Sequence, residues 1–281
     1  MATPKRAGGR ENVRALEKAS LALDRLAGKW WFYAFLFFLG FGLLPPYASR
    51  GYSWEEMGDV ISEGLSHAVI YRLVDLVWPS VLLHVLALAV IAAVALWGEK
   101  ASKAFDIWAF ATYLAIAVSQ GTGISDRYGL VVLTGNVVLG LIVAFSWGLE
   151  CLEGRNKFGK EYLRPRRLWL VPLAAWAYWS PVEPFRLDPR YLIVGYFGVA
   201  YCLTTPVVLA LMALYYPGVN KTAMRLTAFL GLIFGVLNVS RPLMAGPTPA
   251  AIWEGTILHM PLLITSAYAL GITIRASRKR G

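Results

Sequence analysis

The sequence is poor in the residues that most enzymes and metal sites need. It has two cysteines, Cys151 and Cys202, and three histidines, and the lack of a CxxC pair excludes the common zinc and redox motifs. It also lacks a P-loop, a GxSxG-type serine centre and an aspartate-rich magnesium motif. Charged residues make up only 16% of the chain. No catalytic signature is present, and we expect a protein that is not an enzyme.

Long apolar runs are the main feature of this chain. Hydrophobic residues are 57% of its 281 residues, whereas soluble domains contain roughly 45 to 50% apolar residues. A helix needs about 20 apolar residues to cross a bilayer, and it pairs its own backbone polar groups there. The sequence predicts an all-α polytopic membrane protein, a bundle of about eight transmembrane helices. The predicted spans are 30–47, 76–97, 107–124, 128–149, 168–182, 191–216, 226–240 and 255–274.

Lysine and arginine fall unevenly on the connections between these spans. Most of the 27 basic residues lie before the first span, around Lys100, between 152 and 167, around Lys221 and in the C-terminal tail. Because positively charged connections stay on the cytoplasmic side, we expect a cell-membrane protein with cytoplasmic N and C termini. The positive charge is expected to bind anionic lipid headgroups on that side, not nucleic acid. The basic residues assigned to the outer side are Arg50, Arg72, Arg127, Arg186, Arg190 and Arg241.

The two halves of the chain suggest an internal duplication. Ala109-Phe110 aligns with Ala228-Phe229, and an even number of spans in each copy would give two parallel four-helix repeats. The alternative interpretation is that apolar helices resemble one another by composition alone. The predicted parts are an amphipathic segment 1–29, a first four-helix unit 30–151, a basic linker 152–167, a second four-helix unit 168–274 and a basic tail 275–281.

Two segments outside the spans have amphipathic patterns. Leu16, Ser20, Leu23 and Ala27 recur at spacings of three and four residues, which predicts a helix on the cytoplasmic lipid surface or against a partner. The long outer connection 48–75 predicts a second, shorter amphipathic helix over the ends of the bundle.

Polar side chains inside the predicted spans are candidates for function, because they are costly in hydrocarbon. By the predicted topology they all lie in the outer half of the membrane. We expect them to line an outward-facing pocket for a small polar or anionic solute, as in a carrier or binding protein, with Arg241 as the anion partner. The alternative is that they are interhelical hydrogen bonds. The candidate substrate-binding residues are Gln120, Asn136, Asn238, Arg241, Glu254 and His259.

His84 and His259 are the two histidines inside the predicted spans. They allow a second hypothesis, a membrane subunit of a redox complex in which they bind quinone or ligate a b-type haem. No metal site is predicted otherwise. A third hypothesis is a structural or assembly subunit that binds a membrane-protein partner or a second copy of itself.

Overall fold

The computed structural model describes the backbone of residues 7–278 and the side chains of residues 14–243 and 246–276. Helix makes up 75% of the structure, which confirms the prediction of a mostly helical protein. The basic residues Lys5, Arg6, Lys279 and Arg280, which contribute to the predicted topology, lie outside the described residues.

Four helical segments within residues 7–278 are long and apolar enough to cross a membrane. The first is the run Val77–Ser119, made of α5 (Val77–Trp97), a 3-10 turn (Gly98–Ala101) and α6 (Ser102–Ser119). A fifth is counted if α1 and α2 form one span, although they meet at 94°. These helices support a multi-pass membrane protein, but their lengths do not establish eight spans. The other three are α7 (Thr134–Glu153), α10 (Lys221–Ala245) and the segment 249–276.

The remaining predicted spans contain shorter helices. α2 (Trp30–Phe38) continues only as a π-helix to Leu43, and α8 covers Leu170–Trp179. The span predicted for 191–216 is helical mainly in α9 (Tyr201–Tyr215). Gly198, just before this helix, has a φ of +81°, which is not a helical conformation. The last span begins with α11 (Pro249–Ala251) and a π-helix (Ile252–Ile257), followed by α12 (Met260–Arg278).

A small antiparallel sheet corrects the all-α prediction. Strands β2 (Thr122–Ser125) and β3 (Gly129–Val132) form a hairpin, and β1 (Tyr47–Ala48) pairs with the other side of β3. The predicted spans 107–124 and 128–149 wrongly continued as helix through these strands. β-Branched residues favour extended structure, and Gly129, at a φ of +71°, supplies the turn.

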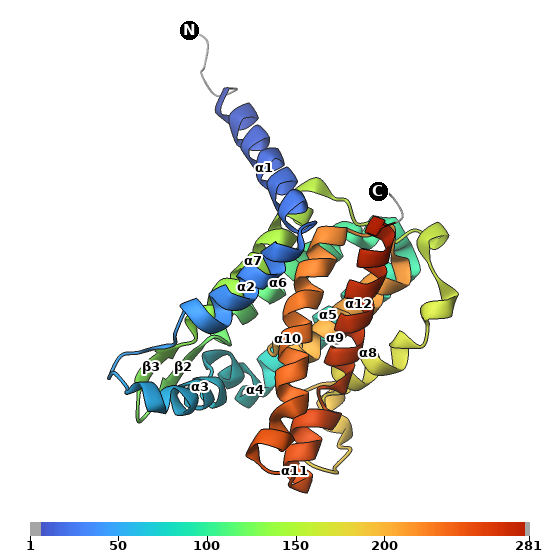
Figure 1. Ribbon diagram of the computed structural model, residues 1–281. Helices are drawn as coiled ribbons and strands as arrows, with labels where there is room; N and C mark the ends of the chain where they lie inside the picture. The colour runs from blue at the N-terminus through green and yellow to red at the C-terminus, as the bar shows by residue number, and fades with distance from the viewer. Residues whose placement is uncertain (1–6, 279–281) are drawn as a thin grey trace.

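A short helix lies against this sheet, as the amphipathic pattern of the outer connection predicts. α3 (Met57–Ser66) buries Val60 and approaches the sheet so closely that a Cβ on Gly123 would lie 2.5 Å from the carbonyl oxygen of Gly64. The short helix α4 (Arg72–Asp75) then leads into α5. We call this end of the molecule the sheet end (Figure 1).

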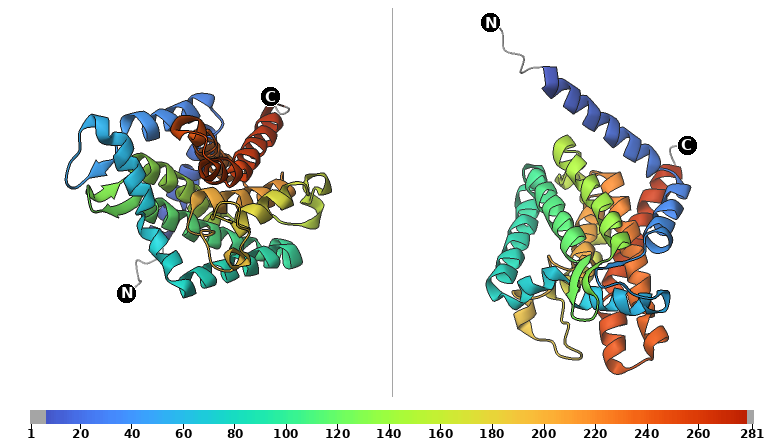
Figure 2. Two further views of the ribbon diagram at one scale, coloured as in Figure 1. Left: turned by 90° about the horizontal axis from the view of Figure 1, so that it is seen from below. Right: turned by 90° about the vertical axis from the view of Figure 1, so that its left-hand side faces the viewer.

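The opposite end of the bundle contains the corner between α1 (Ala7–Leu26) and α2, the connection from α7 to α8 and the connection from α9 to α10 (Figures 1 and 2). Most of the lysines and arginines of the described chain lie here, and we call it the basic end. The predicted amphipathic N-terminal segment is the helix α1. Ser20 and Leu23 in its last turns and Ala27 just after it are buried, whereas Leu16 is exposed.

The core lies between α6, α7, α9 and α10. Trp147 of α7 is fully buried, stacks on Tyr113 of α6 and donates a hydrogen bond to the hydroxyl of Thr227 on α10. α5, in contrast, leaves Leu82, Val85 and several other apolar side chains exposed, as a lipid-facing helix does. The core therefore fixes α6, α7 and α10 relative to one another, and their ends at the basic end position the site.

Candidate functional site

Four polar side chains are buried together at the basic end. They are Asp106 on α6, Glu150 on α7, Asn156 on the connection that follows α7, and Asn220 immediately before α10, with exposed fractions of 0%, 0%, 2% and 4%. A buried carboxyl group is unfavourable unless it is hydrogen-bonded or paired. The contacts of these four residues show how each carboxyl group is accommodated.

Asn156 is the centre of this buried polar network. Its side-chain amide donates to Asp106 Oδ1 at 2.6 Å, its backbone N–H donates to Glu150 Oε1 at 2.5 Å, and its carbonyl Oδ1 accepts from the backbone N–H of Asn220 at 2.7 Å. The side-chain amide of Asn220 donates to Glu150 Oε2. The connection from α7 to α8 is thus bound to α6, α7 and the start of α10.

Asn220 has a second role as the N-cap of α10. Its Oδ1 accepts hydrogen bonds from the backbone N–H groups of Thr222 and Ala223, at 2.9 and 3.1 Å, which satisfies donors that the first turn of a helix leaves open. The same side chain therefore starts α10 and closes the network around Glu150.

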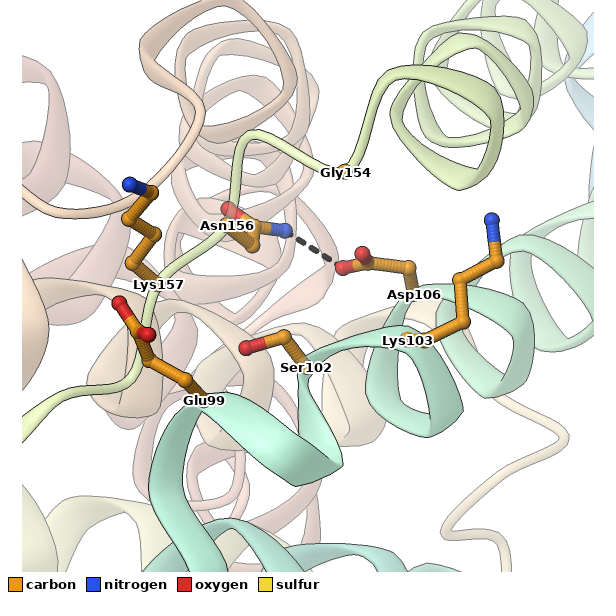
Figure 3. Close-up of a pocket in the computed structure, with 7 residues that line it drawn as sticks. All are labelled: Glu99, Ser102, Lys103, Asp106, Gly154, Asn156 and Lys157. Atoms are coloured by element: carbon orange, nitrogen blue, oxygen red, sulfur yellow. Dashed lines mark hydrogen bonds between the residues drawn. The ribbon is translucent and has the colours of Figure 1, made fainter.

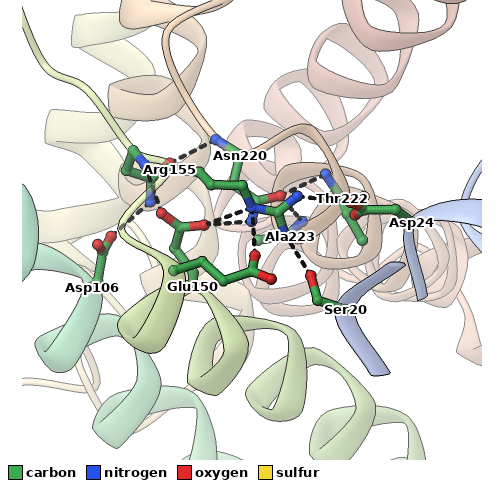
Figure 4. Close-up of polar contacts among 10 residues, drawn as sticks. Ser20, Asp24, Asp106, Glu150, Arg155, Asn220, Thr222 and Ala223 are labelled. Carbon is green, nitrogen blue, oxygen red and sulfur yellow. Dashed lines mark hydrogen bonds and ion pairs between the residues drawn. The ribbon is translucent and has the colours of Figure 1, made fainter. Parts of the chain in front are cut away.

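Arg155 extends the network to α1 (Figure 4). Its guanidinium pairs with Asp24 and with Glu153, both at 2.7 Å, and lies 3.6 Å from Glu150, which is ion-pair distance but too long for a hydrogen bond. Asp24 also accepts a hydrogen bond from the Thr222 hydroxyl at 2.5 Å. The end of α1 is thereby tied to the connection and to α10.

Two cavities open beside this network. Cavity one has a volume of about 230 Å³, and Figure 3 shows Ser102 and Asp106 between the side chains of Lys103 and Lys157. Cavity two has a volume of about 280 Å³. The residues that line cavity one are Glu99, Ser102, Lys103, Asp106, Gly154, Asn156 and Lys157. Those that line cavity two are Asp24, Gly28, Arg155, Lys221, Thr222 and Arg225.

Two residues that line cavity one have buried polar atoms whose hydrogen-bonding capacity is unused. Within the described residues, Asp106 Oδ2 and Ser102 Oγ are buried and have no hydrogen-bond partner, a state that costs roughly 1 to 3 kcal/mol per group. Lys103 and Lys157 are exposed at its rim, and neither forms an ion pair with another described residue. The residues that line the cavity therefore include an acceptor and a hydroxyl group without partners, both buried, and two exposed cations.

The predicted outer-pocket residues lie at the sheet end, away from this network. The structure places Asn238 and Arg241 near the end of α10, Glu254 in the π-helix that follows α11, and His259 in the turn immediately before α12. The Asn238 amide donates to the carbonyl oxygen of Phe234 at 2.8 Å, and His259 Nδ1 lies 2.6 Å from that of Glu254. Arg241 and Glu254 are exposed.

Gln120 and Asn136 are on other elements. The Gln120 amide donates to the Tyr71 hydroxyl at 2.9 Å and accepts from the backbone N–H of Tyr201 at 3.0 Å, so both ends of this side chain join neighbouring segments. Asn136 is half-buried in the first turn of α7. A shared pocket for the six predicted residues stays a prediction.

His84 is buried in an aromatic environment. Its Nδ1 lies 2.8 Å from the carbonyl oxygen of Ser80, and its ring packs against Tyr178 and Phe197, with centroid distances of 5.5 and 5.7 Å. In the described part of the chain, no three His, Cys, Asp or Glu side chains are grouped to hold a metal ion. Binding of haem or quinone by His84 and His259 stays a prediction.

The buried network was missed because it lies at the edges of the predicted spans. Asp106 immediately precedes the span predicted to begin at 107, and Glu150 immediately follows the one predicted to end at 149. One signal was present in the sequence: Asn220 stands where an N-cap would start the next helix. No protein-family model matches this chain, and neither a curated protein nor a solved structure is significantly similar to it.

Proposed function

We propose that this protein is a non-enzymatic membrane protein that binds a small polar ligand with an anionic group, and that cavity one is the binding site. The observation that carries the proposal is the pair of buried atoms without partners, Asp106 Oδ2 and Ser102 Oγ, on two residues that line a cavity with two lysines at its rim. Asp106 can accept a hydrogen bond from the ligand, and Lys103 and Lys157 can attract its anionic group.

The topology that we propose has eight passes. The segments α2, α5, α6, α7, α8, α9, α10 and α12 run alternately between the two ends of the bundle (Figure 1). The short segments α2, α8 and α9 would reach across with the help of their non-helical continuations. The gathering of lysine and arginine at the basic end supports a cytoplasmic location for that end and for both termini. Cavity one then opens at the cytoplasmic interface of the membrane.

Equivalent positions in α6 and α10 support the proposed duplication. Ala109 of α6 and Ala228 of α10 lie at the same position counted from the first residue of their helices, and both are fully buried. The aromatic residues that follow them, Phe110 and Phe229, are both half-buried. On this interpretation Asp106 and Arg225 occupy equivalent positions, and the two copies have diverged in charge beside the two cavities.

Native mass spectrometry of the purified protein tests the proposal. We expect a bound polar molecule on the unmodified protein and its loss from Lys103→Gln and Lys157→Gln, because both substitutions remove a charge from the rim without touching the buried network. Lys160→Gln is the matched control: Lys160 is exposed on the same connection but does not line the cavity. Equal binding by all four proteins would refute the proposal, as would loss only on substitution of Arg241 and His259.

A further inference from the structure

The charged residues that line cavity one indicate which charges its ligand carries. Lys103 and Lys157 contribute two positive charges, and Glu99 and Asp106 contribute two carboxyl groups. In Figure 3 the two ammonium groups lie on opposite sides of the cavity, while the Asp106 carboxyl group lies between them and beside Asn156. A ligand that carries both a negative group and a hydrogen-bond-donating positive group matches this arrangement better than a simple anion does.

The carboxyl group of Asp106 has an oxygen atom that accepts no hydrogen bond. Its Oδ1 accepts from Asn156, but Oδ2 has no partner among the described residues although the side chain is fully buried. The hydroxyl of Ser102, 7% exposed and on the same helix, is in the same state. An ammonium group with N–H donors would satisfy the carboxylate with a charge-assisted hydrogen bond and would leave the lysines for the negative group.

The surface next to the cavity is apolar. On α6, Ile107 follows Lys103 by about one helical turn, and Ile107, Leu114 and Val118 form an exposed stripe that runs from the cavity toward the sheet end. On the adjoining α7, Phe145 and Leu152 are exposed as well. An extended exposed apolar surface on a membrane-spanning helix faces lipid chains, and a lysine at the end of such a stripe reaches the phosphate level of the bilayer.

The wall of the cavity toward α7 is open. Gly154 ends α7 with a φ of +63°, and a Cβ added there would meet no atom within 4 Å. The lining is thus only backbone at the place where the end of α7 approaches Lys103 and Asp106 (Figure 3). A headgroup can enter there while its chains stay on the apolar faces of α6 and α7.

We infer that cavity one holds the headgroup of a zwitterionic phospholipid, with its phosphate between Lys103 and Lys157 and its primary ammonium group on Asp106. This inference rests on the proposed function and names the ligand class for the same site. The lipid comes from the membrane leaflet around the cavity, because the apolar stripes of α6 and α7 lead to the mouth of the cavity.

The test uses the full chain in nanodiscs and compares three lipids that share the same acyl chains. One has a phosphoethanolamine headgroup, one a phosphocholine headgroup, whose trimethylammonium keeps the charge but has no N–H, and one a phosphoglycerol headgroup. Lipid retained after detergent exchange is counted by native mass spectrometry. We expect the phosphoethanolamine lipid to be retained about tenfold better than the phosphocholine lipid, the effect of losing one charge-assisted hydrogen bond.

Two variants locate the bound lipid. Lys103→Gln should weaken retention of the phosphoethanolamine lipid about tenfold, and Asp106→Asn should abolish the preference for it over the phosphocholine lipid. The thermal unfolding of each variant is measured in parallel, and Lys103→Gln keeps the test valid if Asp106→Asn does not fold. Lys160→Gln is the control and should retain lipid as the unmodified protein does.

The outcomes separate the inference from the proposed function. Equal retention of the phosphoethanolamine and phosphocholine lipids, or preferential retention of the phosphoglycerol lipid, would overturn the inferred headgroup. If water-soluble phosphoethanolamine raises the melting temperature as much as the lipid does, and Lys103→Gln removes that effect, the lipid source is wrong while the proposed function stands. If neither the soluble compound nor any lipid depends on Lys103 and Lys157, both fail.

Discussion

Different kinds of contact stand out at the basic end and at the sheet end of the bundle. At the basic end, buried side chains make the contacts, with Asn156 bonded to α6, α7 and the start of α10. At the sheet end, backbones approach closely at glycines: a Cβ on Gly135 would lie only 1.9 Å from the carbonyl oxygen of Gly40. Removing side-chain atoms from the buried network should therefore destabilise the basic end, and adding a side-chain atom at Gly135 should destabilise the sheet end.

Asn156→Ala should have the largest effect. It removes the donor to the buried Asp106 carboxyl group and the acceptor for the Asn220 N–H, and each buried group left without a partner costs roughly 1 to 3 kcal/mol. The melting temperature in detergent measures the effect. Asn136→Ala, at a half-buried position on α7, is the matched control and should change it little. Similar shifts for the two variants would show that the network does not stabilise the basic end.

Gly135→Ala tests the sheet end with the opposite kind of change. The added methyl group overlaps the backbone of the π-helix after α2, so we expect a loss of roughly 1 to 3 kcal/mol in the free energy of unfolding. Gly271→Ala is the control, because a Cβ at that position of α12 meets no atom within 4 Å, and alanine should stabilise the helix by about 1 kcal/mol. A stable Gly135→Ala protein would mean that the two backbones separate easily.

The sequence predicts the helices of this protein better than its strands, for a physical reason. Apolar runs determine where helices lie, so α5, α6, α7 and α10 were found, as was the amphipathic α3. The hairpin of β2 and β3 was missed, because a short run such as 129–132 satisfies the hydropathy of a membrane helix as well as that of a strand. Only the turn at Gly129 distinguishes the two.

The candidate site was missed for a related reason. Asp106, Asn156 and Asn220 are far apart in the sequence, and no local pattern predicts that they contact one another. Their hydrogen bonds exist only because α6, α7 and α10 pack together through residues such as Trp147. The candidate residues came from inside the predicted spans, whereas Asp106 and Glu150 fall just outside them.

Asp24→Ala should have an intermediate effect and shows how firmly α1 is bound to the basic end. Asp24 pairs with Arg155 and accepts from Thr222, but its side chain remains about one-third exposed, at 32%, so we expect a loss of about 1 kcal/mol. Hydrogen exchange of the last turns of α1 should become faster while exchange in α7 is unchanged. Glu17→Ala, an exposed position on the same helix, should leave both rates unaltered, and equal acceleration by the two variants would contradict the proposed role of Asp24.

The smallest effect is expected for the exposed ion pair between Arg127 of the hairpin and Glu56 before α3. The pKa of Glu56 is lowered from 4.5, first by a hydrogen bond from the Ser53 backbone N–H and then by Arg127. A carboxyl group whose pKa is lowered by folding stabilises the protein above its unfolded pKa, and this contribution disappears as the pH falls through the folded value. The melting temperatures of the unmodified protein and Glu56→Gln should therefore differ slightly and constantly above about pH 4.5, and converge below it. A difference that grows on acidification would contradict this assignment, because it would mean that folding raises the pKa of Glu56 and that its protonated form is the stabilising one.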